Sequence, residues 1–155
     1  MTDVVTNSSC LIGLERIQQL QLLPQVFMSI VIPEAVQQEI GFRAAFLKVQ
    51  PVQNQNLVTI LKTQVDDGEA EAIALAQEIS ASYLILDDGK ARKLANQLNL
   101  KVIGTVGVLL RAKQQQIIPA VRPLLDALLL ANFRISEALV QKALQLAGEV
   151  ESDQS

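Results

Sequence analysis

The chain has 155 residues, of which half are hydrophobic and only 3% aromatic, and its formal net charge is −3. These values indicate a folded domain whose core consists of Leu, Ile, Val and Ala, and they exclude a disordered chain. Because there is no histidine and a single cysteine, the sequence excludes a Ser-His-Asp triad, a histidine-ligated zinc site and an internal disulfide. Since neither a secretory signal nor an apolar run long enough to span a bilayer is recognisable, we expect a cytoplasmic protein.

Strand and helix patterns alternate along the first 115 residues, and helices complete the chain. The patterns predict short strands at residues 4–6, 29–32, 57–61, 83–86 and 102–103. They predict helices from Ser8 or Ser9 to Ile17 and at residues 33–40, 42–49, 69–79, 89–98, 105–115, 120–131 and 136–147. This alternation predicts a three-layer α/β/α sandwich with a central, mostly parallel sheet of four to five strands and a helical C-terminus. We expect one domain over residues 1–147 and a polar tail at 148–155.

Polar and acidic side chains come near the predicted carboxyl ends of the strands. Asn7 follows the first strand, Asp87 the fourth and Thr105 the fifth, while Glu69 opens the helix that leads to the fourth strand. Ligands of open α/β sheets bind beyond the carboxyl ends of the strands. Carboxylates gathered there in a chain without histidine suggest a site for a hard cation, Mg²⁺ or Mn²⁺.

The other carboxylates in this region have competing interpretations. Glu69 shares the small apolar face of its helix and should point inward. Glu71 is either a ligand or a favourable charge at the positive end of a helix. Asp88 stands where an N-cap is needed, and we expect it to be the cap rather than a catalytic group. Glu39 shares an apolar helix face, so it either meets a partner or a cation or lies at a solvent-exposed edge.

A strongly basic segment runs from residue 89 to residue 125, with seven Lys and Arg residues and no Asp or Glu. A basic surface beside an acidic site would suit a polyanion drawn to a metal centre. The competing interpretation is that these residues form the ordinary solvated faces of surface helices. The candidate nucleic-acid contacts are Lys90, Arg92, Lys93, Arg111 and Lys113.

In their order and spacing these segments resemble the PIN domain, a small metal-dependent nuclease fold. The resemblance covers nearly the whole chain and is greatest to a bacterial and archaeal subfamily of PIN-like proteins. It rests on VVTNSSCLIGL, VIPEAVQQEI, DDGEAEAIALA, LILDDGKARKLA, VIGTVGVLLRAK and IIPAVRPLLDALLLANFRIS.

The resemblance implies a site in which acidic residues hold one or two divalent cations. At the first acidic position PIN nucleases typically carry Asp, and this chain has Asn7 instead. An amide oxygen can coordinate a hard cation but brings no negative charge, so we expect a lower metal affinity. The other catalytic or ligand candidates that the resemblance implies are Glu39, Glu69, Asp87 and Thr105, with Glu71 and Asp88 as near alternatives.

The function implied by the resemblance is metal-dependent hydrolysis of single-stranded RNA, as in the toxins of toxin–antitoxin pairs. The expected partners are RNA, a small antitoxin protein and a second copy of the chain in a homodimer. The alternative, favoured by Asn7, is a catalytically weak PIN-like module that binds RNA or protein. A phosphoacceptor domain is disfavoured because receiver domains carry their acidic pair after the first strand. A dinucleotide-binding enzyme is disfavoured because no G-x-G-x-x-G follows that strand.

Overall fold

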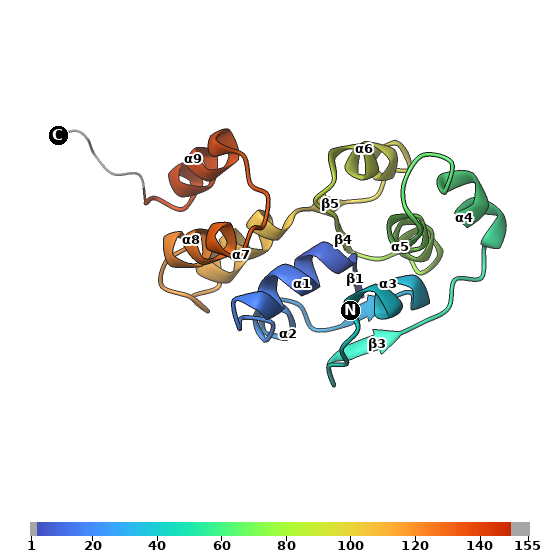
Figure 1. Ribbon diagram of the computed structural model, residues 1–155, viewed down its shortest axis with the longest axis horizontal. Helices are drawn as coiled ribbons and strands as arrows, with labels where there is room; N and C mark the ends of the chain where they lie inside the picture. Colours follow the sequence, from blue (N-terminus) through green and yellow to red (C-terminus); the bar gives the residue numbers. More distant parts are fainter. Residues whose placement is uncertain (1–2, 150–155) are drawn as a thin grey trace. The chain divides into compact units, whose positions relative to one another are not determined.

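A computed structural model describes residues 3–149 of the chain, which form an α/β architecture (Figure 1). The strands are β1 (Val4–Thr6), β2 (Ile30–Ile32), β3 (Leu47–Val49), β4 (Tyr83–Ile85) and β5 (Val102–Ile103). The helices are α1 (Ser8–Arg16), α2 (Leu22–Val26), α3 (Glu34–Ile40), α4 (Gln55–Leu61), α5 (Asp67–Glu78), α6 (Gly89–Gln97), α7 (Thr105–Gln114), α8 (Arg122–Leu130) and α9 (Glu137–Leu146).

The five strands form one sheet in the order β3-β2-β1-β4-β5, and every pair of neighbours is parallel. In the central strand, Val5 is aligned with Val31 of β2 and Leu84 of β4. All residues of β1 and β2 are buried, as expected for a parallel sheet that is covered on both faces. The predicted α/β/α class with a parallel sheet is therefore confirmed. The carboxyl ends of β1, β4 and β5 lie next to one another along one edge of the sheet.

Helix α5 packs on the sheet through small side chains. Ala70, Ala72, Ala74 and Ala76 are fully buried, and they belong to the same apolar cluster as Val5 and the neighbouring strands. Alanine has no side-chain rotamer freedom to lose and is the best helix former, so an alanine-rich helix suits a tightly packed interior position. The close packing fixes the first turn of α5, which carries candidate ligands.

The described residues separate into two compact units. The first, residues 3–12 and 27–105, holds the sheet and all the candidate acidic ligands. The second, residues 13–26 and 106–149, holds α2, α8, α9, most of α7 and the last four residues of α1. The single domain expected over residues 1–147 stays a prediction, and residues 150–155 of the expected tail lie outside the described residues. No helix in the described part of the chain is long and apolar enough to cross a membrane.

Two predicted segments have another structure than the one expected, and helix α2 was not predicted. Residues 42–49 were expected to be helical, but Gly41 ends α3 in a left-handed conformation (φ 73°), and the chain then leads into β3. Residues 57–61 were expected to form a strand, but they belong to α4, whose N-cap Asn54 accepts a hydrogen bond from the backbone N of Leu57 at 3.1 Å. Short apolar runs do not distinguish the two structures, and here the cap favours the helix.

Candidate metal centre

The carboxylate of Asp87, just beyond β4, is held by three hydrogen bonds. Thr105, at the start of α7, donates its backbone N–H to Oδ1 at 2.8 Å and its hydroxyl to Oδ2 at 2.6 Å. Ser9, at the start of α1, donates its hydroxyl to Oδ2 at 3.0 Å. Because these residues follow β4, β5 and β1, three adjacent strands bring them to one point. The hydrogen bonds fix the orientation of the Asp87 carboxylate.

Asn7 lies beside this carboxylate, at the end of β1. Its side chain is buried, at 5% exposure, and its Oδ1 is 3.3 Å from the hydroxyl of Ser9. A hydroxyl has one proton, and the ionised carboxylate of Asp87 at 3.0 Å is the stronger acceptor for it. The amide oxygen of Asn7 therefore keeps lone-pair capacity for a further ligand.

The only cysteine of the chain, Cys10, is buried next to the same group. Burial raises the pKa of its thiol to about 12, and the negative charge of Asp87 adds to this, while hydrogen bonds with Thr105 and Thr6 act in the opposite direction. The thiol therefore stays protonated at neutral pH. This excludes it as a thiolate ligand or nucleophile, and its burial makes it a small residue of the core.

A second group of carboxylates surrounds the N-terminus of α5. Asp66 and Glu69 form a capping box, in which each side chain accepts a hydrogen bond from the backbone N–H of the other residue. Burial raises the pKa of the half-buried Glu69 to about 7, and the negative charges of Asp66, Asp88 and Glu39 raise it further against the hydrogen bond from Asp66. Negative charge is concentrated here, and a cation would stabilise it.

Glu39 occupies the exposed position that was one of its two expected placements. Its carboxylate nevertheless lies directly against Gly68 in the first turn of α5. It is close enough to Glu69 to raise the pKa of that residue. Two predicted ligands from different helices, α3 and α5, are thus brought together.

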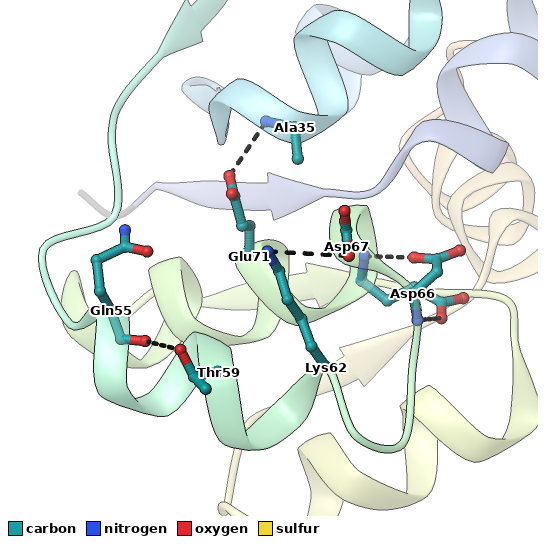
Figure 2. Close-up of polar contacts among 8 residues, drawn as sticks. Ala35, Gln55, Thr59, Lys62, Asp66, Asp67 and Glu71 are labelled. Atoms are coloured by element: carbon teal, nitrogen blue, oxygen red, sulfur yellow. Dashed lines mark hydrogen bonds and ion pairs between the residues drawn. The ribbon is translucent and has the colours of Figure 1, made fainter.

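The two near alternatives have structural partners. Figure 2 shows Glu71 reaching from α5 toward α3, where its Oε1 accepts a hydrogen bond from the backbone N of Ala35 at 3.1 Å. Asp88 accepts a hydrogen bond from the backbone N of Ala91 at 3.0 Å, which confirms the expected N-cap of α6. Glu71 also acts at a helix N-terminus, although this is the N-terminus of α3 and not of its own helix. Ligand roles for both remain predictions.

The candidate nucleic-acid contacts on α6 divide into exposed and anchored side chains. Lys90 and Lys93 are exposed, whereas Arg92 donates from Nη1 to the backbone carbonyl at the end of β4 at 2.9 Å. A Cβ built on Gly104 would lie 2.8 Å from this nitrogen and 3.1 Å from Oδ1 of Asp87. The guanidinium of Arg92 therefore comes near the carboxylate of Asp87 at the end of β5.

The candidates on α7 lie in the second unit. Lys113 forms an ion pair with Glu149 at 2.7 Å and donates to the backbone carbonyl of Ala147 at 2.5 Å. Glu149 also accepts hydrogen bonds from two backbone N–H groups at the start of α8, at 2.8 and 3.0 Å. Arg111 is half-buried. Lys113 thus holds the end of the described chain, and its predicted contact with nucleic acid remains a prediction.

The donor set of the first unit fits a hard cation. It offers only oxygen ligands: the carboxylates of Asp87, Glu69 and Glu39, the amide of Asn7 and the hydroxyl of Thr105. Within residues 3–149, no three acidic or cysteine side chains are grouped so that they could hold an ion by themselves. Mg²⁺ is usually bound by one or two carboxylates, with water and substrate phosphate completing its shell, so the absence of such a group from the described residues does not conflict with this ligand chemistry.

Comparisons with known proteins agree with this geometry. A family model described as a PIN domain, DUF3368, matches residues 3–149. PIN domains generally use divalent metal ions, in accord with the oxygen donors of the candidate site. No curated protein matches the chain. The resemblance inferred from the sequence is therefore confirmed at the level of the family.

Proposed function

Because the chain belongs to the PIN domain family, we propose that it is a metal-dependent ribonuclease that hydrolyses phosphodiester bonds of single-stranded RNA. The observation that carries this proposal is that three hydrogen bonds fix the orientation of the Asp87 carboxylate. Thr105 and Ser9 hold it in one orientation at the edge of the sheet where β1, β4 and β5 end. An orientation fixed before the substrate arrives reduces the reorganisation that catalysis requires.

The residues of the site would bind the metal, hold one of its ligands in place and bind the RNA. Asp87, Glu69 and Glu39 would hold Mg²⁺ or Mn²⁺, and Asn7 would add a neutral amide oxygen. When bound, the metal would lower the pKa of a water molecule and stabilise charge on the phosphate. Thr105 would keep Asp87 in place through its two hydrogen bonds. The exposed lysines of α6 would neutralise phosphates of the RNA backbone.

We also propose partners for the second unit. Leu130 of α8 is 86% exposed and Leu146 of α9 is 65% exposed. Exposed large apolar side chains suit a protein partner, either a small antitoxin or a second copy of the chain in a homodimer. We propose that the protein acts in the cytoplasm as the toxin of a toxin–antitoxin pair. Light scattering of the purified chain would give its oligomeric state.

A second candidate function is a catalytically weak PIN-like module that binds RNA or protein. The observation that favours it is the neutral Asn7 in a buried position beside Asp87. Without a negative charge at this position the site attracts a cation less strongly.

The experiment that separates the two functions is cleavage of a mixed single-stranded RNA pool in Mg²⁺ or Mn²⁺. The wild type is compared with Asp87→Asn and Asn7→Asp, and Asp126→Asn, at an exposed position of α8, serves as the control. A ribonuclease would lose cleavage in Asp87→Asn and keep it in Asp126→Asn. Cleavage by Asn7→Asp alone would indicate a PIN scaffold disabled at its first ligand. If none of the proteins cleaved RNA or bound metal, the binding module would be the function.

A further inference from the structure

The first turn of α5 contains a glycine whose missing side chain leaves room for a carboxylate. Gly68 is buried between Asp67 and Glu69. A Cβ built on it would lie 2.8 Å from both Cδ and Oε2 of Glu39 and still closer to Oε1. These separations are shorter than real Cβ contacts, so the carboxylate of Glu39 occupies the space that any other residue at position 68 would fill.

The backbone does not explain the glycine. The positive φ values among the described glycines belong to Gly41 and Gly148, so Gly68 has a conformation that other residues adopt readily. Glycine is also among the least favourable residues within a helix. The feature of the structure that accounts for glycine at position 68 is thus the close approach of Glu39.

This approach matters for the candidate metal centre. Glu39 comes from α3, and its contact with the first turn of α5 brings its charge next to Glu69. The N-terminal end of a helix also favours a carboxylate. We infer that Gly68 is a positioning residue, which sets the place of the Glu39 carboxylate within the ligand set. This inference rests on the proposed metal-dependent function.

The inference predicts that Gly68→Ala acts on metal binding and leaves the fold intact. The colliding atoms are the end of a flexible, exposed side chain, so Glu39 can swing away while the helix stays in place. A matched control is Gly89→Ala, since Gly89 also follows an Asp in the first turn of a helix but its Cβ would meet nothing within 4 Å.

The test measures Mn²⁺ affinity by electron paramagnetic resonance and thermal unfolding of the metal-free proteins. Gly68→Ala should bind Mn²⁺ about tenfold more weakly than the wild type, the usual effect of losing a group that orients a ligand. Its unfolding temperature should be unchanged or higher, and Gly89→Ala should bind like the wild type. In a Glu39→Gln background, Gly68→Ala should have no further effect, because the carboxylate that it displaces is already gone.

The outcomes separate this inference from the proposed function. Three results would overturn the positioning role. The first is that Gly68→Ala binds Mn²⁺ as tightly as the wild type, and the second is that it loses the same Mn²⁺ affinity in the Glu39→Gln background as in the wild type. The third is that metal-free Gly68→Ala fails to fold. If Asp87→Asn still abolished Mn²⁺ binding in those cases, the proposed function would stand. A wild type that binds no Mn²⁺ would overturn both.

Discussion

Restoring the missing acidic residue should destabilise the metal-free protein. In Asn7→Asp the new carboxylate would share the hydroxyl of Ser9 with Asp87, since that hydroxyl is 3.3 Å from Oδ1 of Asn7 and 3.0 Å from Oδ2 of Asp87. Two oxygens within reach of one hydroxyl are on the order of 5 Å apart. Two charges at that distance repel by roughly 3 kcal/mol at an effective dielectric constant of about 20. Partial protonation relieves some of this repulsion, so we expect a loss of about 1–3 kcal/mol in the free energy of unfolding.

Urea unfolding at pH 8 in the presence of a chelator measures this loss, and added Mn²⁺ should reverse it because the cation neutralises both carboxylates. The control is Asn96→Asp, at an exposed position of α6, which should change the free energy by less than about 0.5 kcal/mol. The double variant Asn7→Asp/Asp87→Asn restores a single charge and should lack the repulsion. Equal losses for Asn7→Asp in the wild-type and Asp87→Asn backgrounds would refute the electrostatic reasoning.

Three other perturbations have outcomes that the structure determines. Folding raises the pKa of Glu69 from 4.5 to about 7, so the stability that its protonated form contributes is present below pH 4.5 and is lost as the pH rises through 7. In urea unfolding of the metal-free proteins, Glu69→Gln should therefore have the same free energy of unfolding as the wild type at pH 4 and a higher one at pH 8. Lys113→Met should lower the free energy of unfolding by about 1–3 kcal/mol at pH 7. Although burial raises the pKa of Glu149, its hydrogen bonds with Lys113 and backbone N–H groups lower it overall, so this difference should fade as pH falls below 4.5. Glu71→Ala should lower stability by about 1 kcal/mol through loss of the bond to Ala35, without the tenfold loss of Mn²⁺ affinity expected of a ligand.

Periodicity was sufficient to predict four of the five strands of the parallel sheet, but not β3 and not every helix around the sheet. The runs at 4–6 and 83–86 are followed by polar residues and the run at 102–103 by Gly104, and each of them contains a strand. The run LVTIL at 57–61 is equally apolar and rich in β-branched residues, yet it is helical because Asn54 caps it. Propensity differences of a few tenths of a kcal/mol per residue, summed over five residues, are of the same order as the effect of one good cap, so a cap can decide between helix and strand.

The candidate site was predicted best where its residues follow strands. The position after a strand placed Asp87 and Thr105 at the same edge of the sheet, and the structure joins them by two hydrogen bonds. Ser9 was not predicted as a partner of Asp87, because a serine at this position is also a common helix cap. The signal that could have indicated it is its place two residues after Asn7, just beyond the end of the first strand. The partner of Glu71 could not be predicted, since a contact between α5 and α3 depends on tertiary packing that helical spacing does not encode.

The neutral Asn7 should alter the metal concentration that the site requires more than the rate it can reach. Charge in the structure is concentrated around Glu69, whose pKa is raised by burial and further by neighbouring carboxylates, and Asn7 retains an oxygen ligand without adding to that charge. The loss of one charge near a cation, at roughly 1.4–2.8 kcal/mol, corresponds to about a 10- to 100-fold weaker affinity. RNA cleavage by the wild type should therefore saturate at a Mn²⁺ concentration higher by that factor than cleavage by Asn7→Asp, with plateaus of similar height. If the wild type reached saturation with bound Mn²⁺ and still did not cleave, Asn7 would have removed a step of the chemistry, and the protein would act as a binding module.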